Sequence, residues 1–193
     1  MVSAVSKKIL DWLGFNITGN INDPHKKKLY VVVPHTSNWD FPLGILVKWG
    51  YKLKAGFIAK NSLFKPPFGW LFRALGGIPV DRSRKSDTVK NIAEVFRNTK
   101  ELRIAIAPEG TRKKVDQLKK GFYYIAKEAG IPILLVKFDF ENKVVHFSEP
   151  FFPGTEEAED WNFLNNYWNG VHGKIPENSF GYGKTPKITE GSL

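Results

Sequence analysis

Hydrophobic and polar positions follow two kinds of pattern along the chain. Short runs rich in β-branched residues predict strands, and residues 29–34 (LYVVVP) are the clearest example. Longer segments carry apolar residues at spacings of three and four, which predicts helices. In chain order, helices are expected at residues 2–13, 38–50, 66–74, 87–100, 118–129 and 156–168, and strands at residues 29–34, 55–60, 78–80, 103–107, 133–138 and 143–147.

This alternation of strands and helices indicates an α/β domain built around one sheet. No internal repeat and no linker divides the sequence, so residues 1–193 are expected to form a single domain. Residues 173–193 are rich in glycine, proline and lysine, which predicts an extended or partly disordered tail.

The first 14 residues predict an amphipathic helix. Its apolar stripe rests either on its own domain or on a bilayer interface, and its members are Val2, Val5, Ile9, Trp12 and Leu13. Charged residues interrupt every apolar stretch well before the roughly 18 residues that span a bilayer. No transmembrane helix is therefore expected.

The net positive charge of the chain indicates which classes of molecule it binds. Lys and Arg total 29 against 19 Asp and Glu, a formal net charge of +10, and residues 41–85 hold nine basic side chains against one acid. Such a surplus favours a nucleic acid, a membrane surface or a phosphorylated substrate, although a merely solvated basic face is the simpler alternative. The absence of cysteine excludes a disulfide scaffold, a thiolate metal site and a cysteine nucleophile.

Within the basic region, residues 57–73 interleave large apolar side chains, most of them aromatic, with Lys60, Lys65 and Arg73. Aromatic rings beside cations suit a membrane interface or the mouth of an acyl-chain groove. The alternative is a core of aromatic residues beneath surface cations.

The first candidate for chemistry is the segment PHTSNWD, which follows the strand at residues 29–34. On a continuous helix His35 and Asp40 would point about 140° apart. If a turn separates the strand from the next helix, the two side chains converge. A carboxylate that holds Nδ1–H then leaves Nε2 as a base toward a hydroxyl group.

Two further segments are associated with strand ends and carry groups suited to anions. GGIPVDR includes Arg82, and PEGTRKK places Glu109, Gly110, Thr111 and Arg112 in one loop. A glycine allows close approach of the backbone, and a guanidinium offers a planar fork to phosphate. A fourth segment, GIPI at residues 130–133, leads into a buried strand, and all four are expected to share one crevice at a sheet edge.

The four segments, in this order and spacing, resemble the glycerolipid acyltransferases, whose best-known members are the 1-acylglycerol-3-phosphate (lysophosphatidate) acyltransferases. The resemblance covers residues 29–138. It implies a mixed, mostly parallel central sheet flanked by helices, with His35 as the catalytic base and Asp40 as its orienting partner. It also implies acceptor-phosphate binding by Arg82 and by the residues of the third segment, Glu109, Gly110, Thr111 and Arg112.

By this resemblance the protein moves a fatty acyl group from acyl-CoA or acyl carrier protein to the hydroxyl of a lysophosphatidate-like acceptor in phospholipid biosynthesis. The thioester is a co-substrate, and neither a cofactor nor a metal is implied. The expected partners are the thioester donor, the lysolipid acceptor and an anionic membrane surface. The expected location is cytoplasmic, peripheral to the inner face of the membrane.

Two alternatives stay open. The acceptor could be another lipid, such as a lyso-ornithine lipid or another lysolipid, or the chain could be a basic module that binds anions or nucleic acid. No nucleic acid is expected as a partner, because no signature of an RNA- or DNA-binding domain is present. The other histidines, His25, His146 and His172, are interpreted as structural or solvated.

Overall fold

The computed structural model describes residues 1–80 and 85–183, and within them seven strands form one sheet. The strands are β1 (Asn16–Gly19), β2 (Lys27–Val33), β3 (Gly56–Lys60), β4 (Gly77–Val80), β5 (Leu102–Ile106), β6 (Ile133–Asp139) and β7 (Val144–Phe147). Their order across the sheet is β1-β7-β6-β2-β5-β3-β4. Only β6 and β7 pair antiparallel, through a tight hairpin, and every other neighbouring pair is parallel.

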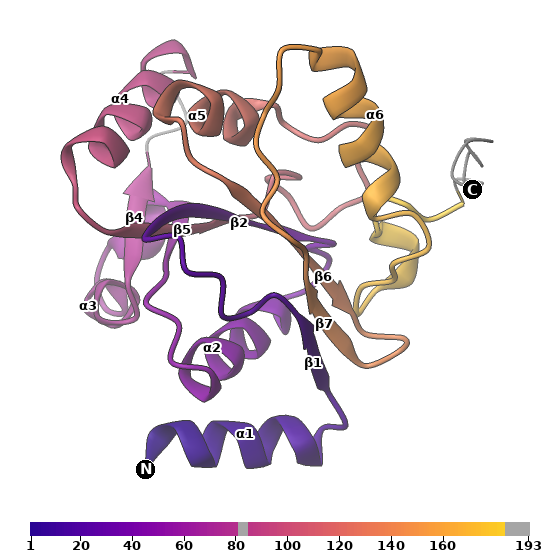
Figure 1. Cartoon of the computed structure of the whole chain (residues 1–193). Coiled ribbons are helices and arrows are strands. Elements are labelled where there is room, and N and C mark those ends of the chain that lie inside the picture. Colours follow the sequence, from indigo (N-terminus) through magenta and orange to yellow (C-terminus); the bar gives the residue numbers. More distant parts are fainter. Residues whose placement is uncertain (81–84, 184–193) are drawn as a thin grey trace.

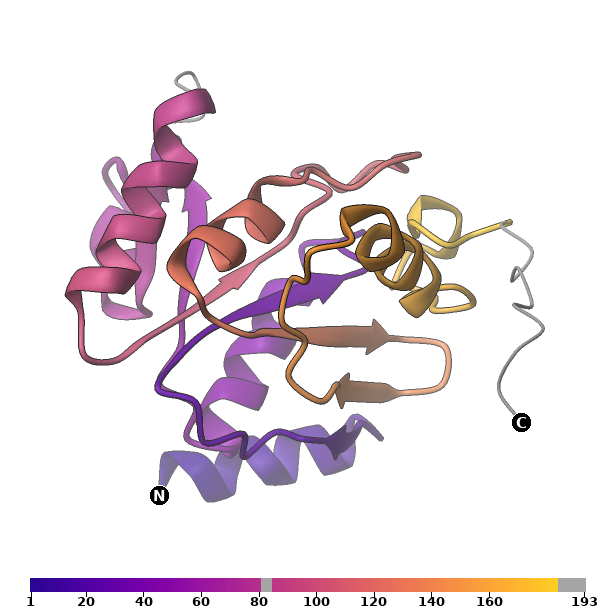
Figure 2. The same ribbon diagram turned by 45° about the horizontal axis from the view of Figure 1, so that its top comes forward.

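Helices cover both faces of the sheet (Figure 1). α4 (Lys85–Asn98), α5 (Gly121–Ala129) and α6 (Glu157–Tyr167) lie on one face, and α1 (Val2–Trp12) and α2 (Asp40–Gly50) lie on the other. α3 (Gly69–Ala74) and the short 3₁₀ helix η1 (Asn61–Phe64) lie beside the edge strand β4, and η1 also contacts its neighbour β3. Figure 2 shows the same layers from a second direction, with α1 beneath α2. The predicted α/β class, with a mixed, mostly parallel sheet flanked by helices, is confirmed.

Two apolar clusters, one on each face, hold these layers together. On the face of α4, α5 and α6, Phe96, Phe122 and Trp168 pack against Leu29 and Val31 of the central strand β2. On the other face, the second cluster consists mainly of residues of α1, α2, β2, β6 and β7, including Leu10, Leu43, Val47, Tyr30 and Val136. The strand at the centre of the fold is thus buried on both faces, as is usual for parallel sheets.

The N-terminal helix docks on α2, but not through its apolar stripe. Ser6 and Leu10 are buried, and the Ser3 hydroxyl donates to the Gly50 carbonyl at 2.8 Å. The five members of the stripe are all exposed, from 37% for Leu13 to 84% for Trp12. The two alternatives for this helix are therefore not exclusive, because one side packs on the domain and the apolar side stays open.

Several observed elements differ from those expected. The strand β1 was not expected, since its four residues carry no strong alternation and it forms by pairing with β7. The helix expected at residues 118–129 begins only at Gly121, and the one expected at residues 66–74 begins at Gly69. In the tail expected to be extended or partly disordered, the described residues 173–183 include the buried Ser179 and Phe180 and a 3₁₀ helix η2 (Pro176–Asn178), while Lys174–Glu177 are exposed.

Candidate active site

The carboxyl ends of β2 and β5 meet at one edge of the sheet. The two strands are parallel neighbours, with Val31 opposite Ile106. The segment with His35 follows the end of β2, and the segment with Glu109 follows the end of β5. Loops after parallel strands gather at this edge, which is where open α/β sheets place their ligands.

His35 and Asp40 converge across the turn between β2 and α2. The Nδ1 atom of His35 lies 2.9 Å from Oδ2 of Asp40, which is the first residue of α2. The same carboxylate oxygen accepts the backbone N–H groups of Thr36 and Ser37, each at 2.9 Å. Because a carboxylate only accepts, Nδ1 carries the hydrogen and Nε2 presents its lone pair. The His35 side chain is 26% exposed, whereas the Asp40 carboxylate that holds it is buried.

Glu109 approaches the same turn from the loop after β5. Its Oε1 atom accepts the backbone N–H of His35 at 2.9 Å, and the residue is only 3% exposed. Burial is the main cause that raises the pKa of Glu109 to about 7; the hydrogen bond and charge of His35 oppose this rise, and the charge of Asp40 adds to it. Glu109 is therefore a buried group that contacts the backbone of His35, and it does not lie in an open anion site.

The rest of the third segment is open to solvent. Thr111 and Arg112 are exposed, and Gly110 has a left-handed φ of +65°. A Cβ atom at Gly110 would also collide with the ammonium group of Lys119, whose side chain lies along this glycine. The left-handed backbone conformation favours glycine here, and the lysine side chain would have to move if a Cβ atom were added.

Lys119 is a candidate that sequence reasoning missed. The expected helix included it, whereas the observed helix begins at Gly121 and leaves Lys119 in the loop. Its backbone N–H donates to the Pro108 carbonyl at 3.0 Å, which holds the loop closed on itself. No acid among residues 1–80 and 85–183 forms an ion pair with its ammonium group.

The fourth segment does not share this edge, and that expectation was wrong. Residues 130–132 precede β6, and Ile133, its first residue, pairs with Leu29 near the start of β2. The Pro132 carbonyl accepts the Leu29 N–H at 3.0 Å. Because β6 and β2 are parallel, this segment lies at the amino edge, opposite His35. Arg82, the remaining predicted phosphate ligand, lies outside the described residues.

A segment near the C-terminus supports the turn that carries His35. The buried hydroxyl of Thr36 accepts the Ile175 N–H at 3.1 Å. Gly173 packs so closely on Thr36 that an added Cβ would lie 2.6 Å from the threonine methyl carbon. The Ser179 hydroxyl in turn accepts the Gly173 N–H at 2.9 Å. Sequence gave no signal for this contact, which joins residues 139 positions apart.

The other histidines have local partners. His25 contacts Asp23 at 2.9 Å, His146 lies 2.9 Å from the Thr18 hydroxyl, and His172 pairs with Glu141. Within the described ranges, no group of three His, Asp or Glu side chains is placed to hold a metal ion. A hollow of about 690 Å³ between residues 116–120 and α6 is lined by none of the residues named above for the site.

Comparison with known proteins places the chain in a family. The model of the Acyltransferase family matches residues 14–138. The 1-acyl-sn-glycerol-3-phosphate acyltransferase of Cocos nucifera is 33% identical over 137 residues, covering 67% of this chain and 44% of the relative. The protein of the same name from Escherichia coli (strain K12) is 38% identical over 82 residues, covering 40% of this chain and 34% of the relative.

Among solved structures, the crystal structure of the 1-acyl-sn-glycerophosphate (LPA) acyltransferase PlsC from Thermotoga maritima has a TM-score of 0.55 and 27% sequence identity. The match covers 83% of this chain and 73% of that one. The chain therefore belongs to the Acyltransferase family, and the resemblance to glycerolipid acyltransferases is confirmed. The matched segments span less than half the length of the curated relatives.

Proposed function

We propose that this protein is an O-acyltransferase that moves a fatty acyl group from a thioester to the hydroxyl of a 1-acylglycerol 3-phosphate acceptor. The observation that carries the proposal is the His35–Asp40 pair, fixed at the carboxyl edge with Nε2 free to act as a base. The names of the relatives support the acceptor class.

In the proposed reaction, Nε2 of His35 accepts the proton of the acceptor hydroxyl as its oxygen attacks the thioester carbonyl carbon. The resulting imidazolium is stabilised by Asp40 through Nδ1–H. When the tetrahedral intermediate collapses, the C–S bond breaks and the Nε2 proton passes to the leaving thiolate. The side chain ends in its starting state, and no covalent enzyme intermediate is formed.

Exposed cations in the loop that also carries Glu109 suit an anionic acceptor. Arg112 offers a guanidinium fork, and Lys119 adds an ammonium group against Gly110 in the same loop. With Arg82, which the resemblance implies, they would hold the phosphate while the hydroxyl faces His35. The thioester donor, acyl-CoA or acyl carrier protein, is part of the same proposal.

A thioester-by-acceptor assay tests this function. The free thiol is measured with purified protein in detergent, using acyl-CoA or acyl carrier protein and either 1-acylglycerol 3-phosphate or a lysolipid without a phosphate monoester. We expect thiol release that requires the phosphate acceptor and disappears in His35→Ala. Equal release with the other lysolipids would reject the acceptor class, and full activity of His35→Ala would reject the mechanism.

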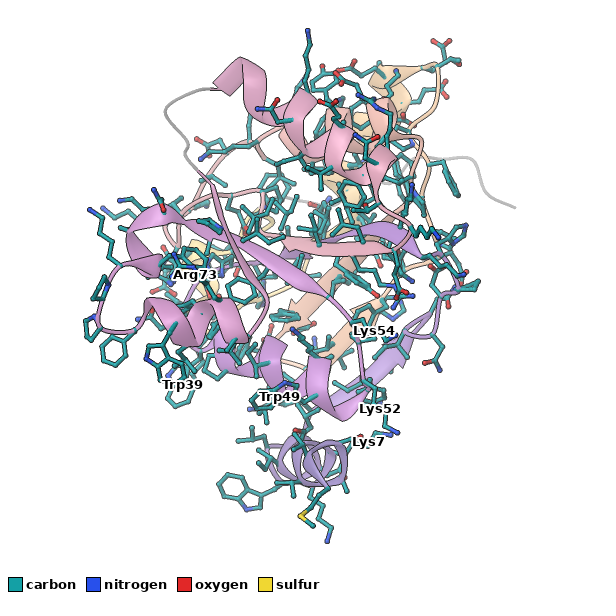
Figure 3. All side chains as sticks on the ribbon, turned by 90° about the vertical axis from the view of Figure 1, so that its left-hand side faces the viewer. Lys7, Trp39, Trp49, Lys52, Lys54 and Arg73 are labelled. Carbon is teal, nitrogen blue, oxygen red and sulfur yellow. The ribbon has the colours of Figure 1, made fainter. Side chains whose placement is uncertain are left out.

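The face around α1, α2 and α3 supports a second part of the proposal, binding to an anionic membrane. Figure 3 shows Trp39, Trp49, Lys7, Lys52, Lys54 and Arg73 on one side of the molecule. Trp39 is 64% exposed and directly precedes Asp40, so an apolar surface adjoins the base. No helix in the described part of the chain is both long and apolar enough to cross a bilayer.

Exposed aromatic rings and cations of α1, α2 and α3 suit the interface of an anionic bilayer, where rings enter the headgroup region and cations pair with lipid charges. Trp12 on α1 and Trp70 on α3 are 84% and 69% exposed, and Phe68 is 63% exposed. Rings of this kind settle at the headgroup level, and each nearby Lys or Arg adds about 1 kcal/mol at an anionic leaflet. Among the three cations of residues 57–73, Arg73 donates a hydrogen bond to the Phe64 carbonyl at 3.1 Å.

Co-sedimentation with vesicles tests the membrane proposal. We expect binding to phosphatidylglycerol-rich vesicles, little binding to pure phosphatidylcholine, and release at high salt, because the Debye length falls to about 3 Å at 1 M. The double variant Trp12→Ser/Trp70→Ser should bind weakly. Phe163→Ser is the matched control, since Phe163 is 48% exposed on α6, across the sheet. Wild-type sedimentation of the double variant would place the binding surface elsewhere.

A further inference from the structure

Glu109 differs from its neighbours in being hidden from solvent. The residue is 3% exposed, whereas Thr111 and Arg112 in the same loop are exposed. A carboxylate placed against the phosphate of an acceptor would repel it. The family resemblance assigns Glu109 to acceptor binding, but its burial and its charge both favour another task.

Glu109 contacts His35, the residue that carries the proposed base. Oε1 accepts the His35 N–H at 2.9 Å, joining the loop after β5 to the residue that carries the imidazole. Oε2 is buried and has no hydrogen-bond partner among the described residues. The Asp40 carboxylate holds the other side of the turn through the Thr36 and Ser37 N–H groups. Two carboxyl groups thus fix three consecutive backbone N–H groups.

Resting on the proposed acyl transfer, we propose that Glu109 is a positioning residue: its carboxyl oxygen fixes the backbone of His35, so that Nε2 stays aimed at the acceptor hydroxyl, and the side chain does not contact the acceptor. A shift of about 1 Å in such a group can cost roughly 10²-fold in rate. Positioning therefore acts on turnover rather than on acceptor binding.

The protonation state of Glu109 does not alter this task. Its raised pKa, about 7, means that both forms are present near neutrality, and both keep an oxygen that accepts the His35 N–H. The charged and titratable groups that face it in the described part are His35 and Asp40 from the β2–α2 turn, and Lys119 beside the adjoining Gly110. Glutamine reproduces the neutral form and retains the acceptor oxygen.

Steady-state kinetics of two substitutions test the inference. Glu109→Gln should keep kcat and both KM values within about threefold of wild type, whereas Glu109→Ala should lower kcat about 10- to 100-fold with an unchanged acceptor KM. Glu128→Gln, an exposed position on α5, is the control. A raised acceptor KM in an active Glu109→Gln would overturn the inference. Failure of the proposed function looks different, because the wild type itself would then release no thiol.

Two measurements are independent of turnover. Exchange of the His35 amide hydrogen should be slow in wild type and in Glu109→Gln but fast in Glu109→Ala. Equal exchange rates in the alanine variant and wild type would contradict the hydrogen bond.

The pH dependence of stability is the second measurement. The pKa of Glu109 in the folded protein, about 7, lies above its ordinary value of 4.5. The stabilisation that comes from protonated Glu109 is therefore complete below pH 4.5 and is lost as the pH rises through 7. The denaturation midpoint of Glu109→Gln should lack this decline, and a decline like that of wild type would count against a buried Glu109.

Discussion

The two ends of β2 each carry a histidine against an aspartate. At the amino end, Nδ1 of His25 lies 2.9 Å from Oδ2 of Asp23, and at the carboxyl end, Nδ1 of His35 lies 2.9 Å from Oδ2 of Asp40. Both aspartates are buried, and both histidines are partly exposed. The distance between imidazole and carboxylate does not distinguish the two ends.

The difference lies in what balances the carboxylate. The ammonium group of Lys28 is buried and lies 2.6 Å from Oδ1 of Asp23. Burial raises the pKa of Asp23, but the hydrogen bonds from Lys28 and His25 outweigh it and lower the pKa below its usual value. Among the described residues, no Lys or Arg forms an ion pair with Asp40, which accepts two backbone N–H groups instead.

A carboxylate without a cation is the one that can assist a base. When His35 takes up a proton, the imidazolium supplies the positive charge that Asp40 lacks, whereas Lys28 already supplies it to Asp23. The histidine–aspartate contact at the amino end of β2 therefore stabilises the fold. In the proposed reaction, the one at the carboxyl end stabilises the protonated base.

Removing each imidazole should produce the largest contrast. We expect His35→Ala to lower kcat/KM by about 10²- to 10⁴-fold, the usual contribution of a general base. His25→Ala should leave kcat/KM near the wild-type value, because Lys28 still pairs with Asp23. Thiol-release kinetics measure both variants, with circular dichroism to verify folding. A comparable loss of turnover in His25→Ala would abolish the distinction between the ends.

Exchanging each aspartate for asparagine should separate turnover from stability. Asp40→Asn should lower kcat about 10²-fold or more, because the imidazolium loses its counter-charge. Asp23→Asn should leave turnover intact but lower the free energy of unfolding by about 3 kcal/mol, since it leaves the buried Lys28 charge unpaired. Urea unfolding and thiol release are measured on both. If Asp23→Asn unfolds at the wild-type urea concentration, the ion pair at the amino end is not the support proposed here.

The cations of the loop after β5 are exposed, and their removal should have the smallest effect. Arg112→Lys and Lys119→Gln should each raise the acceptor KM about tenfold, the size of one charge-assisted hydrogen bond, with little change in the donor KM. Lys120→Gln is the matched control, because Lys120 points to Glu157 at 3.7 Å and lies over the Trp161 ring. Equal changes for donor and acceptor would remove both residues from the phosphate site.

The sequence predicts the layers and the first motif well because their signals are local. β-branched residues of the central strand and the helical spacing of α2 are visible without tertiary information. The turn residues between His35 and Asp40 also predict that the two side chains converge, as the structure shows.

What escaped prediction depends on pairing between distant segments. β1 is a strand only because β7 lies beside it, and Thr36 meets Ile175 across most of the chain. The fourth motif was assigned to the wrong edge because it precedes its strand, whereas the motifs with His35 and Glu109 follow theirs. Lys119 was not recognised because the expected helix included it, whereas the observed helix α5 begins two residues later, at Gly121.

The position of the last described residues has a consequence for fragments of this protein. The family match ends at residue 138, but Trp168 and Phe180 fill the core beyond it, and the Trp168 indole N–H donates to the Val136 carbonyl at 3.3 Å. A chain cut after residue 138 would lose β7 and leave β6 as an open edge with unpaired backbone groups. Such an edge recruits strands from other copies, so the shortened protein should aggregate rather than fold.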